Sequence, residues 1–194
     1  MSASSSIIDL DPSDEDCVSA LVALSLASAA MHAPNWLPTE RAAREEVEGA
    51  CSTTDGRFTR VAVLPSREPQ GWISCVNLYA GVWEIHPLLV AREHHGKRVG
   101  SRLVRDVEAR LVELGATVVV LSTSDEVGAT SLFDQDLYAD PLKALMNMEV
   151  HRPHAVQFWT RMGYALVGVT PDAEGPGRPA IHFARTPRPL DAYS

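Results

Sequence analysis

Hydrophobic positions along this chain follow two periods, which divide it into short strands and amphipathic helices. Strands are predicted where apolar and β-branched residues cluster between turn residues: Ile7–Leu10, Phe58–Leu64, Trp72–Tyr79, Val82–Val90, Ala116–Leu121, Tyr164–Val169 and Pro179–Arg185. Helices are predicted where apolar residues recur every three or four positions, up to about residue 29 and over residues 40–50, 98–114 and 153–162. The order β-α-α-β-β-β-α-β-α-β-β predicts a mixed α/β sheet flanked by helices.

Capping residues and prolines mark the expected helix ends. Asp11 or Ser13 is expected to cap the first helix, and the two prolines of His32–Pro38 stop it. Thr39 is expected to cap the second helix. Pro153 opens the last helix at a position where its missing N–H is tolerated.

The helix at 98–114 lies between two predicted strands and indicates a parallel step. Its apolar residues form one stripe that faces the core: Val99, Leu103, Val107, Leu111 and Leu114. The strand Ala116–Leu121 is continuously apolar, which is typical of a strand buried on both faces. A helix that joins two strands of one sheet implies a parallel pair with a right-handed crossover.

The turn before this helix is suited to bind an anion. Backbone N–H groups of His95-Gly96-Lys97-Arg98-Val99-Gly100 and the helix N-terminus face one point, which suits a pyrophosphate. Glu84 lies on the preceding strand and is a candidate base for an incoming amine. The alternative interpretation of Glu84 is a surface carboxylate on a half-exposed strand.

Composition and charge argue against several classes of protein, namely nucleic-acid-binding, secreted and membrane-spanning proteins. The chain has 194 residues, which suits one domain over 1–194 with a loose tail after about 186. Its net charge of −8 argues against nucleic-acid binding and is compatible with a cationic ligand. Its three cysteines give no disulfide framework, and the apolar run Cys17–Met31 lacks the basic flank of a secretory signal. No apolar run reaches the length of a membrane span. We therefore expect a cytoplasmic protein that binds neither nucleic acid nor membrane.

The segment 122–152 is long and weakly patterned, which points to a functional loop or to hidden short helices. It is also acidic. Against the single Lys143 it carries Asp125, Glu126, Asp134, Asp136, Asp140 and Glu149. Such a rim would steer and bind a polycation, and a solvated acidic loop is the alternative.

These features resemble the GNAT superfamily of acetyl-coenzyme A-dependent N-acetyltransferases, and more narrowly the aminoglycoside 6'-N-acetyltransferases. The resemblance spans roughly residues 70–190, with a weaker match at Trp36. The residues that carry it are Trp83-Glu84-Ile85-His86-Pro87-Leu88, Gly100-Ser101-Arg102-Leu103-Val104, Asp136-Leu137-Tyr138, Phe158, Met162-Gly163-Tyr164, Val167-Gly168-Val169, Pro179–Ile181 and Pro187-Arg188-Pro189. It implies a largely antiparallel central sheet whose parallel step splays around the acetyl-CoA site.

The resemblance implies acetyl-CoA (acetyl-coenzyme A) as co-substrate and assigns roles to individual residues. Glu84 is the expected base and the N–H of Leu88 the oxyanion donor, since Pro87 cannot donate to the ladder and marks a bulge or strand end. Coenzyme contacts are expected from Leu88, Leu89, Val90, His95, Gly96, Lys97, Arg98, Val99, Gly100, Ser101 and His154. Acceptor contacts are expected from Trp36, Tyr79, Glu84, His86, Asp125, Glu126 and Asp136. A core tryptophan at Trp36 and an ordinary strand histidine at His86 are the alternatives.

Two positions depart from the family pattern. The family's pyrophosphate turn usually reads Gln/Arg-x-x-Gly-x-Gly/Ala, whereas this chain has His95 and Arg98 at the first two of these positions and keeps Gly100. In the family, backbone N–H groups bind the pyrophosphate, so a changed side chain need not abolish binding. Lys97 and Arg98 add positive charge beside the phosphates.

The second departure is Trp159, which stands where many relatives have a tyrosine that reprotonates the departing thiolate. An indole N–H cannot act as an acid near neutral pH. Water or another hydroxyl would then supply the proton. Tyr164 is the nearest such hydroxyl in the sequence, although the family usually buries that position.

Three functions fit these features. The first is acetyl transfer to the 6'-amine of an aminoglycoside by direct attack in a ternary complex, which confers antibiotic resistance. The second is the same chemistry on another small amine, a polyamine or a protein N-terminus. The third, favoured by Trp159 and the altered turn, is a non-catalytic module that binds acyl-CoA and a partner protein.

The resemblance implies a homodimer. No metal is expected, because His94-His95 and His151-Arg152-Pro153-His154 lack the spacing of a metal site.

Overall fold

The structure, a computed structural model, describes residues 5–52, 56–189 and 192. Within these residues seven strands form one sheet in the order β1-β2-β3-β4-β5-β7-β6. Neighbouring strands are antiparallel except β4 and β5, which are parallel, so the expected mixed and largely antiparallel sheet is confirmed. The strands are β1 (Ser6–Asp9), β2 (Arg57–Val63), β3 (Pro69–Tyr79), β4 (Val82–Val90), β5 (Val118–Ser124), β6 (Ala165–Thr170) and β7 (Ala180–Arg185).

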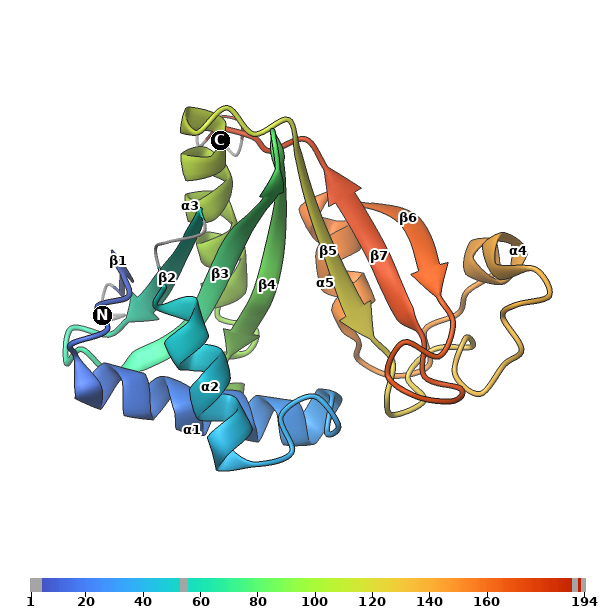
Figure 1. Cartoon of the computed structure of the whole chain (residues 1–194), viewed down its shortest axis with the longest axis horizontal. Coiled ribbons are helices and arrows are strands. Elements are labelled where there is room, and N and C mark those ends of the chain that lie inside the picture. Colours follow the sequence, from blue (N-terminus) through green and yellow to red (C-terminus); the bar gives the residue numbers. More distant parts are fainter. Residues whose placement is uncertain (1–4, 53–55, 190–191, 193–194) are drawn as a thin grey trace.

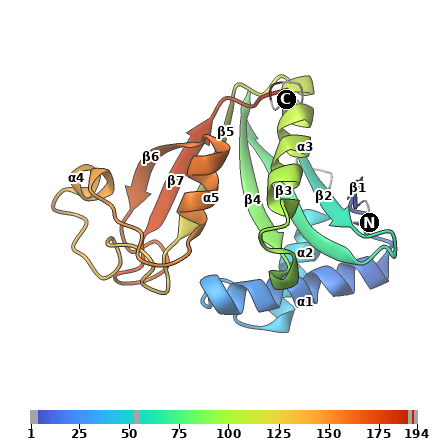
Figure 2. The same cartoon turned by 180° about the vertical axis from the view of Figure 1, so that it is seen from behind.

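Helices lie on both faces of this sheet (Figures 1 and 2). They are α1 (Glu15–His32), α2 (Glu40–Ala50), the 3-10 helix η1 (Arg92–His94), α3 (Val99–Glu113), α4 (Pro141–Met146) and α5 (Ala155–Met162). α1 and α2 lie on one face of the N-terminal half of the sheet, and α3 lies on the opposite face together with α5, which covers β5 and β7.

Alternation along the strands supplies a hydrophobic core on each face of the sheet. Trp83 and Ile85 of β4 pack with the apolar stripe of α3. Val61 of β2 and Trp72 of β3 pack on the other face with α1 and α2. Trp72 is fully buried, and its indole N–H donates to the hydroxyl of Ser25 at 3.1 Å, so the polar atom of this large side chain is satisfied.

The sheet opens between β4 and β5. Parallel pairing extends only from Val82 opposite Val118 to Glu84 opposite Val120. Beyond this pair the two strands diverge (Figure 1), and the C-terminal part of β4 keeps β3 as its strand neighbour. The splayed parallel step expected from the sequence is therefore confirmed.

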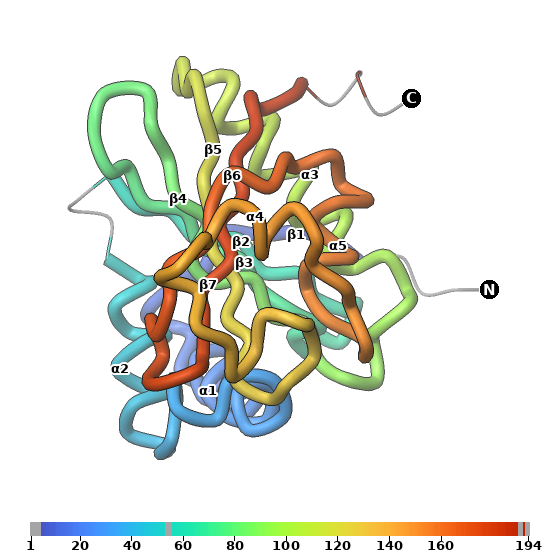
Figure 3. Tube along the Cα trace, turned by 90° about the vertical axis from the view of Figure 1, so that its right-hand side faces the viewer, coloured from blue at the N-terminus to red at the C-terminus, as the bar shows by residue number. Residues whose placement is uncertain are grey.

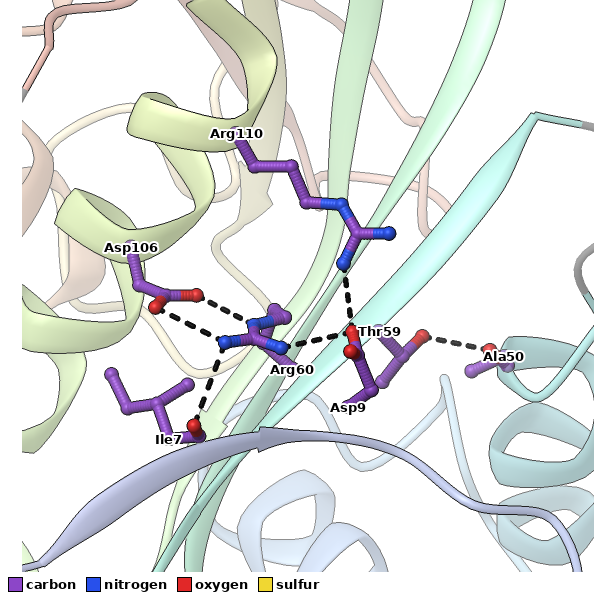
Figure 4. Close-up of polar contacts among 7 residues, drawn as sticks. All are labelled: Ile7, Asp9, Ala50, Thr59, Arg60, Asp106 and Arg110. Carbon is purple, nitrogen blue, oxygen red and sulfur yellow. Dashed lines mark hydrogen bonds and ion pairs between the residues drawn. The ribbon is translucent and has the colours of Figure 1, made fainter. Parts of the chain in front are cut away.

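An ion-pair network ties the N-terminal strand to α3 (Figure 4). Arg60 of β2 donates through Nε to Asp106 of α3 at 2.6 Å, and another of its nitrogens lies 2.9 Å from Asp9 of β1. Arg110 of α3 approaches the same Asp9 oxygen at 2.7 Å. Beside them, Thr59 donates its hydroxyl at 2.7 Å to the carbonyl of the last residue of α2. Side chains thus link β1, β2, α2 and α3 in addition to the backbone pairing of the strands.

The segment between β5 and α5 is mostly irregular and contains α4, which confirms the expectation of a hidden short helix in 122–152. Figure 3 shows it on the β6 and β7 side of the molecule. The buried carboxylate of Asp125 organises its start by accepting from the N–H of Ala129 at 2.9 Å and from the N–H and hydroxyl of Thr130 at 2.7 and 2.8 Å. Burial raises the pKa of Asp125, but these hydrogen bonds outweigh it, so the pKa lies below its usual value.

The caps of the first two helices agree only in part with prediction. Thr39 caps α2 as expected. Asp14 caps α1, and the prediction of Asp11 or Ser13 was wrong, because Asp11 accepts from the N–H and hydroxyl of Ser13 in a turn before the helix. α1 also continues past its predicted end to His32.

The prediction that Pro153 begins the last helix was wrong as well. α5 begins at Ala155 because the His154 side chain caps it. The Nδ1 atom of His154 accepts from the N–H of Val156 at 3.3 Å, and its Nε2 lies 3.0 Å from the carbonyl of Ser124, to which it must donate.

β5 is not buried on both faces, as its apolar run had predicted. Val119 and Leu121 are buried, whereas Val118 and Val120 are half-buried and Ser122 is exposed. The reason is that α1 and α2 pack mainly against β2, β3 and β4. Apart from β4, whose bounds agree, the strand bounds differ from prediction by a few residues.

The expected end of the helix at 98–114 needs correction. Leu114 is 53% exposed instead of joining the buried stripe, because α3 ends at Glu113. The segment after β7 is held as far as Arg188, whose N–H donates to the buried carboxylate of Glu108 at 3.1 Å. Residues 190–191 and 193–194 of the predicted loose tail lie outside the described residues.

Candidate active site

β4 carries a β-bulge beside the opening of the sheet. Its ladder with β3 skips from Ile85 to Leu88, so that His86 and Pro87 together oppose one residue of β3. Proline has no N–H for the ladder, and bulges are among the few places where a sheet accepts it. The bulge expected at Pro87 is therefore confirmed.

Beyond the bulge, β4 has a neighbouring strand on only one of its backbone edges, as far as the described residues extend. Leu88, Leu89 and Val90 are half-buried and lie past the last parallel pair with β5. An extended ligand with amide groups can hydrogen-bond to such an edge as an added strand would. The opening thus offers a backbone surface for a linear ligand.

Glu84 and His86 face away from the core that contains α3. Trp83 and Ile85 are buried in that core, so the alternate residues of β4 face the side that carries α1 and α2. Glu84 is half-buried, and within the described residues its carboxylate has no hydrogen-bond partner. A carboxylate that can accept a proton or an N–H therefore stands where the sheet opens.

Three elements meet around His86 on this face. Its ring lies 5.4 Å from the ring of Trp36, in the loop between α1 and α2, in an edge-on contact. Its Nε2 atom lies 3.7 Å from a carboxylate oxygen of Glu46 on α2. The loop of Trp36 is fastened by Asn35, whose N–H donates to Glu126 at 2.9 Å. The predicted acceptor residues that share this region are Trp36, Glu84, His86 and Glu126.

Glu46 was absent from the predicted site, although its helical spacing contained a signal. It follows Ala43 by three positions and precedes Ala50 by four, and both alanines are buried. It therefore lies at the edge of the packed stripe of α2, and only 20% of its side chain is exposed. A partly buried carboxylate at that spacing is recognisable from sequence, but its neighbour His86 is not.

The turn between η1 and α3 has the backbone conformation of an anion cradle. Gly96 has φ 73° and Arg98 has φ 62°, and Arg98 is the N-cap of α3. Left-handed residues among right-handed ones make successive N–H groups converge on an anion. Arg98 occupies the position of the family's middle glycine, and an L side chain adopts this conformation at a cost of roughly 1 kcal/mol.

Side chains hold this turn against β4 and α5. His95 donates from Nε2 to the carbonyl of Val90 at 2.9 Å. A Cβ added to Gly100 would lie 3.4 Å from Phe158 and 3.6 Å from Val90, so the first turn of α3 packs closely on both elements. Of the other residues predicted to contact the coenzyme here, Lys97 is exposed, Val99 is buried and Ser101 is half-buried.

The other predicted acceptor residues have different surroundings. The carboxylate of Asp125 is committed to hydrogen bonds within its own loop. Asp136 is exposed and accepts from the N–H of Tyr138 at 3.2 Å. Tyr79 is 66% exposed and pairs with Val82, on the same face of β4 as the candidate base. Contacts of these residues with an acceptor, and of His154 with the coenzyme, stay predictions.

Neither Trp159 nor Tyr164 is placed to protonate a departing thiolate. Trp159 is 5% exposed and packs edge-on against Phe158 and Tyr164, with ring centroids 5.0 Å apart in each pair. Tyr164 is buried and donates its hydroxyl to Glu108 at 2.8 Å. Both residues belong to the core beside α3, as expected for Tyr164.

The cysteines are not activated nucleophiles. Burial raises the pKa of the Cys75 thiol, and burial with nearby carboxylates raises the pKa of Cys17 and Cys51.

In the part of the chain that the structure describes, no group of three or more His, Cys, Asp or Glu residues could hold a metal ion. No helix there is long and apolar enough to cross a membrane.

Residues 26–138 match the model of a protein family described as the acetyltransferase (GNAT) family. This match spans more than half of the 194 residues. The chain belongs to the GNAT acetyltransferases. Binding of acetyl-CoA at the splayed β4 and β5 and at the turn before α3 stays a prediction.

Solved GNAT structures resemble this chain over nearly its whole length. An aminoglycoside 6'-N-acetyltransferase complexed with coenzyme A is 28% identical with a TM-score of 0.83, and the alignment covers 95% of this chain and 98% of that one. An aminoglycoside 6'-N-acetyltransferase from Enterococcus faecium is 28% identical with a TM-score of 0.80 and the same coverage. An aminoglycoside 6'-acetyltransferase type Ii is 25% identical with a TM-score of 0.67, again over 95% and 98% of the two chains. No curated protein matches the sequence significantly.

Proposed function

We propose that this GNAT acetyltransferase transfers the acetyl group of acetyl-CoA to the 6'-amino group of aminoglycosides and so confers resistance to them. The observation that carries the proposal is the half-buried Glu84 carboxylate at the opening between β4 and β5, with Trp36 and His86 on the same side. Support for the acceptor comes from the three similar aminoglycoside acetyltransferases, two of which are 28% identical over 95% of the chain.

The residues at the opening fit acetyl-CoA. The stretch of β4 from Leu88 to Val90, past the last pair with β5, suits the amide-bearing pantetheine arm, and the left-handed turn at Gly96 and Arg98 suits the pyrophosphate. Bound there, the coenzyme supplies an acetyl thioester. The exposed Lys97 and Arg98 add positive charge beside the phosphates.

The carboxylate of Glu84 and the N–H of Leu88, both on β4, then act on the reacting groups. A protonated alkyl amine has a pKa near ~10 and is mostly charged at neutral pH. Glu84 holds this amine and accepts its proton, directly or through one water. The N–H of Leu88, just past the bulge, donates to the acetyl carbonyl oxygen as negative charge develops on it. The amine attacks the thioester directly in this proposal, and the raised pKa values of the three cysteine thiols do not favour a cysteine acyl-enzyme.

The leaving thiolate takes its proton from water in this scheme. Trp159 is buried among aromatic rings, and the hydroxyl of Tyr164 is bound to Glu108. A relative that uses a tyrosine acid would show a basic limb in its pH–rate profile from that tyrosine. The proposal expects no such limb here.

The proposed function is tested by thiol release from acetyl-CoA with a panel of amines. Kanamycin and tobramycin, which carry a 6'-amine, should release thiol above background, and spermidine and a peptide N-terminus should not. Faster turnover of spermidine or the peptide would favour another acceptor. Coenzyme binding without turnover of any amine would favour a non-catalytic module.

The homodimer implied by the resemblance is tested by light scattering during size-exclusion chromatography.

A further inference from the structure

We propose that Glu46, together with Trp36 and His86, forms a second cation subsite that binds an ammonium group of the acceptor other than the one acetylated. The inference rests on the proposed function and names a specificity-determining residue for it. The subsite lies on the face of β4 that also carries Glu84, between α2 and the loop that joins α1 to α2.

The side chain of Glu46 is largely buried, and the nearest charged or titratable side chain to its carboxylate in an ion-pair contact is His86. Its side chain is 20% exposed, and its distance of 3.7 Å from the Nε2 of His86 exceeds hydrogen-bond length. Within the described residues it makes no hydrogen bond. Its oxygens are not among the buried, unpartnered polar atoms, so they keep contact with solvent and can accept from an ammonium group that enters from there.

The cations of α2 do not neutralise Glu46. Arg41 pairs with Glu45 at 3.1 Å and Arg44 pairs with Glu48 at 3.7 Å, both on the exposed side of the helix. The carboxylate of Glu46 instead points from α2 toward β4, where His86 is its neighbour.

Trp36 supplies an apolar wall to the same subsite. Its ring meets His86 edge-on at 5.4 Å, and it is half-buried. The preceding residue, Asn35, is fastened to Glu126, which is 6% exposed, so the loop has a fixed anchor on the segment after β5. An indole beside a carboxylate suits an amino sugar, since the ring can pack on the sugar and attract a nearby cation.

The subsite and the candidate base lie at different positions along β4. Glu84 and His86 are two residues apart on one strand, so their Cα atoms lie roughly 7 Å apart. An acceptor whose neutral amine lies at Glu84 can thus place a second, protonated amine toward Glu46. This predicts a preference for acceptors with several amines over acceptors with one.

The test compares Glu46→Gln with the matched control Glu45→Gln, which alters the neighbouring, exposed glutamate of the same helix. Tobramycin and a sugar with a single 6-amino group serve as acceptors. Glu46→Gln should raise the KM for tobramycin by roughly 10-fold or more, the effect of a lost charge-assisted contact. It should leave kcat, the KM for the single-amine sugar and the affinity for coenzyme A unchanged. Glu46→Asp should fall between wild type and Glu46→Gln, because it keeps the charge.

Each other outcome is decisive. A KM for tobramycin that is the same in Glu46→Gln and Glu45→Gln would overturn the subsite while leaving the proposed function intact. An equal rise in KM for both acceptors would also overturn it, because that pattern indicates a general structural effect. A wild-type protein that acetylates no aminoglycoside would overturn the proposed function, and the subsite with it.

Discussion

Glu84 of β4 lies opposite Val120 of β5 in the last pair of the parallel ladder between these strands. One residue pair therefore marks both the end of strand pairing and the position of the candidate base. Pro87 follows within the bulge, and Leu88 comes directly after it, past the last pair with β5. The candidate base Glu84 and the proposed oxyanion donor Leu88 thus lie on one stretch of strand.

Replacing Glu84 with Gln should lower kcat/KM by roughly 10²–10⁴-fold, because an amide keeps the size of the side chain but cannot accept a proton. The affinity for coenzyme A, measured by calorimetry, should stay at the wild-type value. Glu113→Gln, at the exposed end of α3, is the control and should behave as wild type. Parallel losses of turnover and coenzyme affinity in Glu84→Gln would contradict a base role.

Replacing Arg98 with Gly should weaken coenzyme A binding without weakening the fold. Arg98 has φ 62°, so glycine removes a strained conformation of roughly 1 kcal/mol and offsets its own greater chain entropy. The lost cation should raise the Kd for coenzyme A by roughly 3–10-fold at low salt and by less at high salt, where phosphate contacts are screened.

Titration calorimetry at two salt concentrations, with a melting curve, checks this expectation for Arg98. Lys143→Gln removes a cation from the exposed surface of α4 and should leave the Kd unchanged. An identical salt dependence of Kd in wild type and Arg98→Gly would show that backbone amides alone hold the phosphates.

Replacing Asp125 with Asn should lower the free energy of unfolding by about 2–3 kcal/mol at pH 7, since a buried acceptor of several hydrogen bonds is lost. Its pKa in the folded protein lies below the usual value, so its stabilisation is present above pH ~4 and disappears as the pH falls through the folded pKa. The gap between wild type and variant should therefore shrink on acidification. Urea unfolding at a series of pH values measures it, with the exposed Asp136→Asn as control. A gap that stays constant down to pH 3 would rule out this role of the carboxylate.

Replacing Arg60 with Gln should cost about 1–2 kcal/mol of unfolding free energy, whereas Arg110→Gln should cost less than about 1 kcal/mol. The Arg60 side chain is 16% exposed and bonds two carboxylates, while Arg110 is 41% exposed and its partner Asp9 is 67% exposed. Solvent screening therefore weakens the second pair. Urea titrations at low and high salt check both variants. Equal costs would show that burial does not separate the two pairs.

Local patterns explain why parts of the site were predictable. The bounds of β4 and the Thr39 cap depend on residues within one element, so period and capping rules found them. The same period placed Glu84 and His86 on one face. The cap of α1 was missed because three nearby residues could fill that position, and Asp14 fills it in place of the predicted Asp11 or Ser13.

Burial of individual side chains was harder to predict, because it depends on which helix covers a residue. Val120 looked like a core residue in sequence but lies on a face of β5 that α1 and α2 cover only weakly. Asp125 looked like part of a solvated rim, yet the loop folds around its carboxylate. Trp159 looked like a changed catalytic residue and is a core side chain.

The sequence by itself determined the order of the strands and of the helices α1, α2, α3 and α5, and the strand that carries Glu84, since each depends on neighbours along the chain. Only the tertiary structure decided that Glu46, Trp36 and His86 lie together. Their meeting depends on how α2 and the loop before it dock on the sheet, which is set by the packing of a whole hydrophobic core. No local period contains that information.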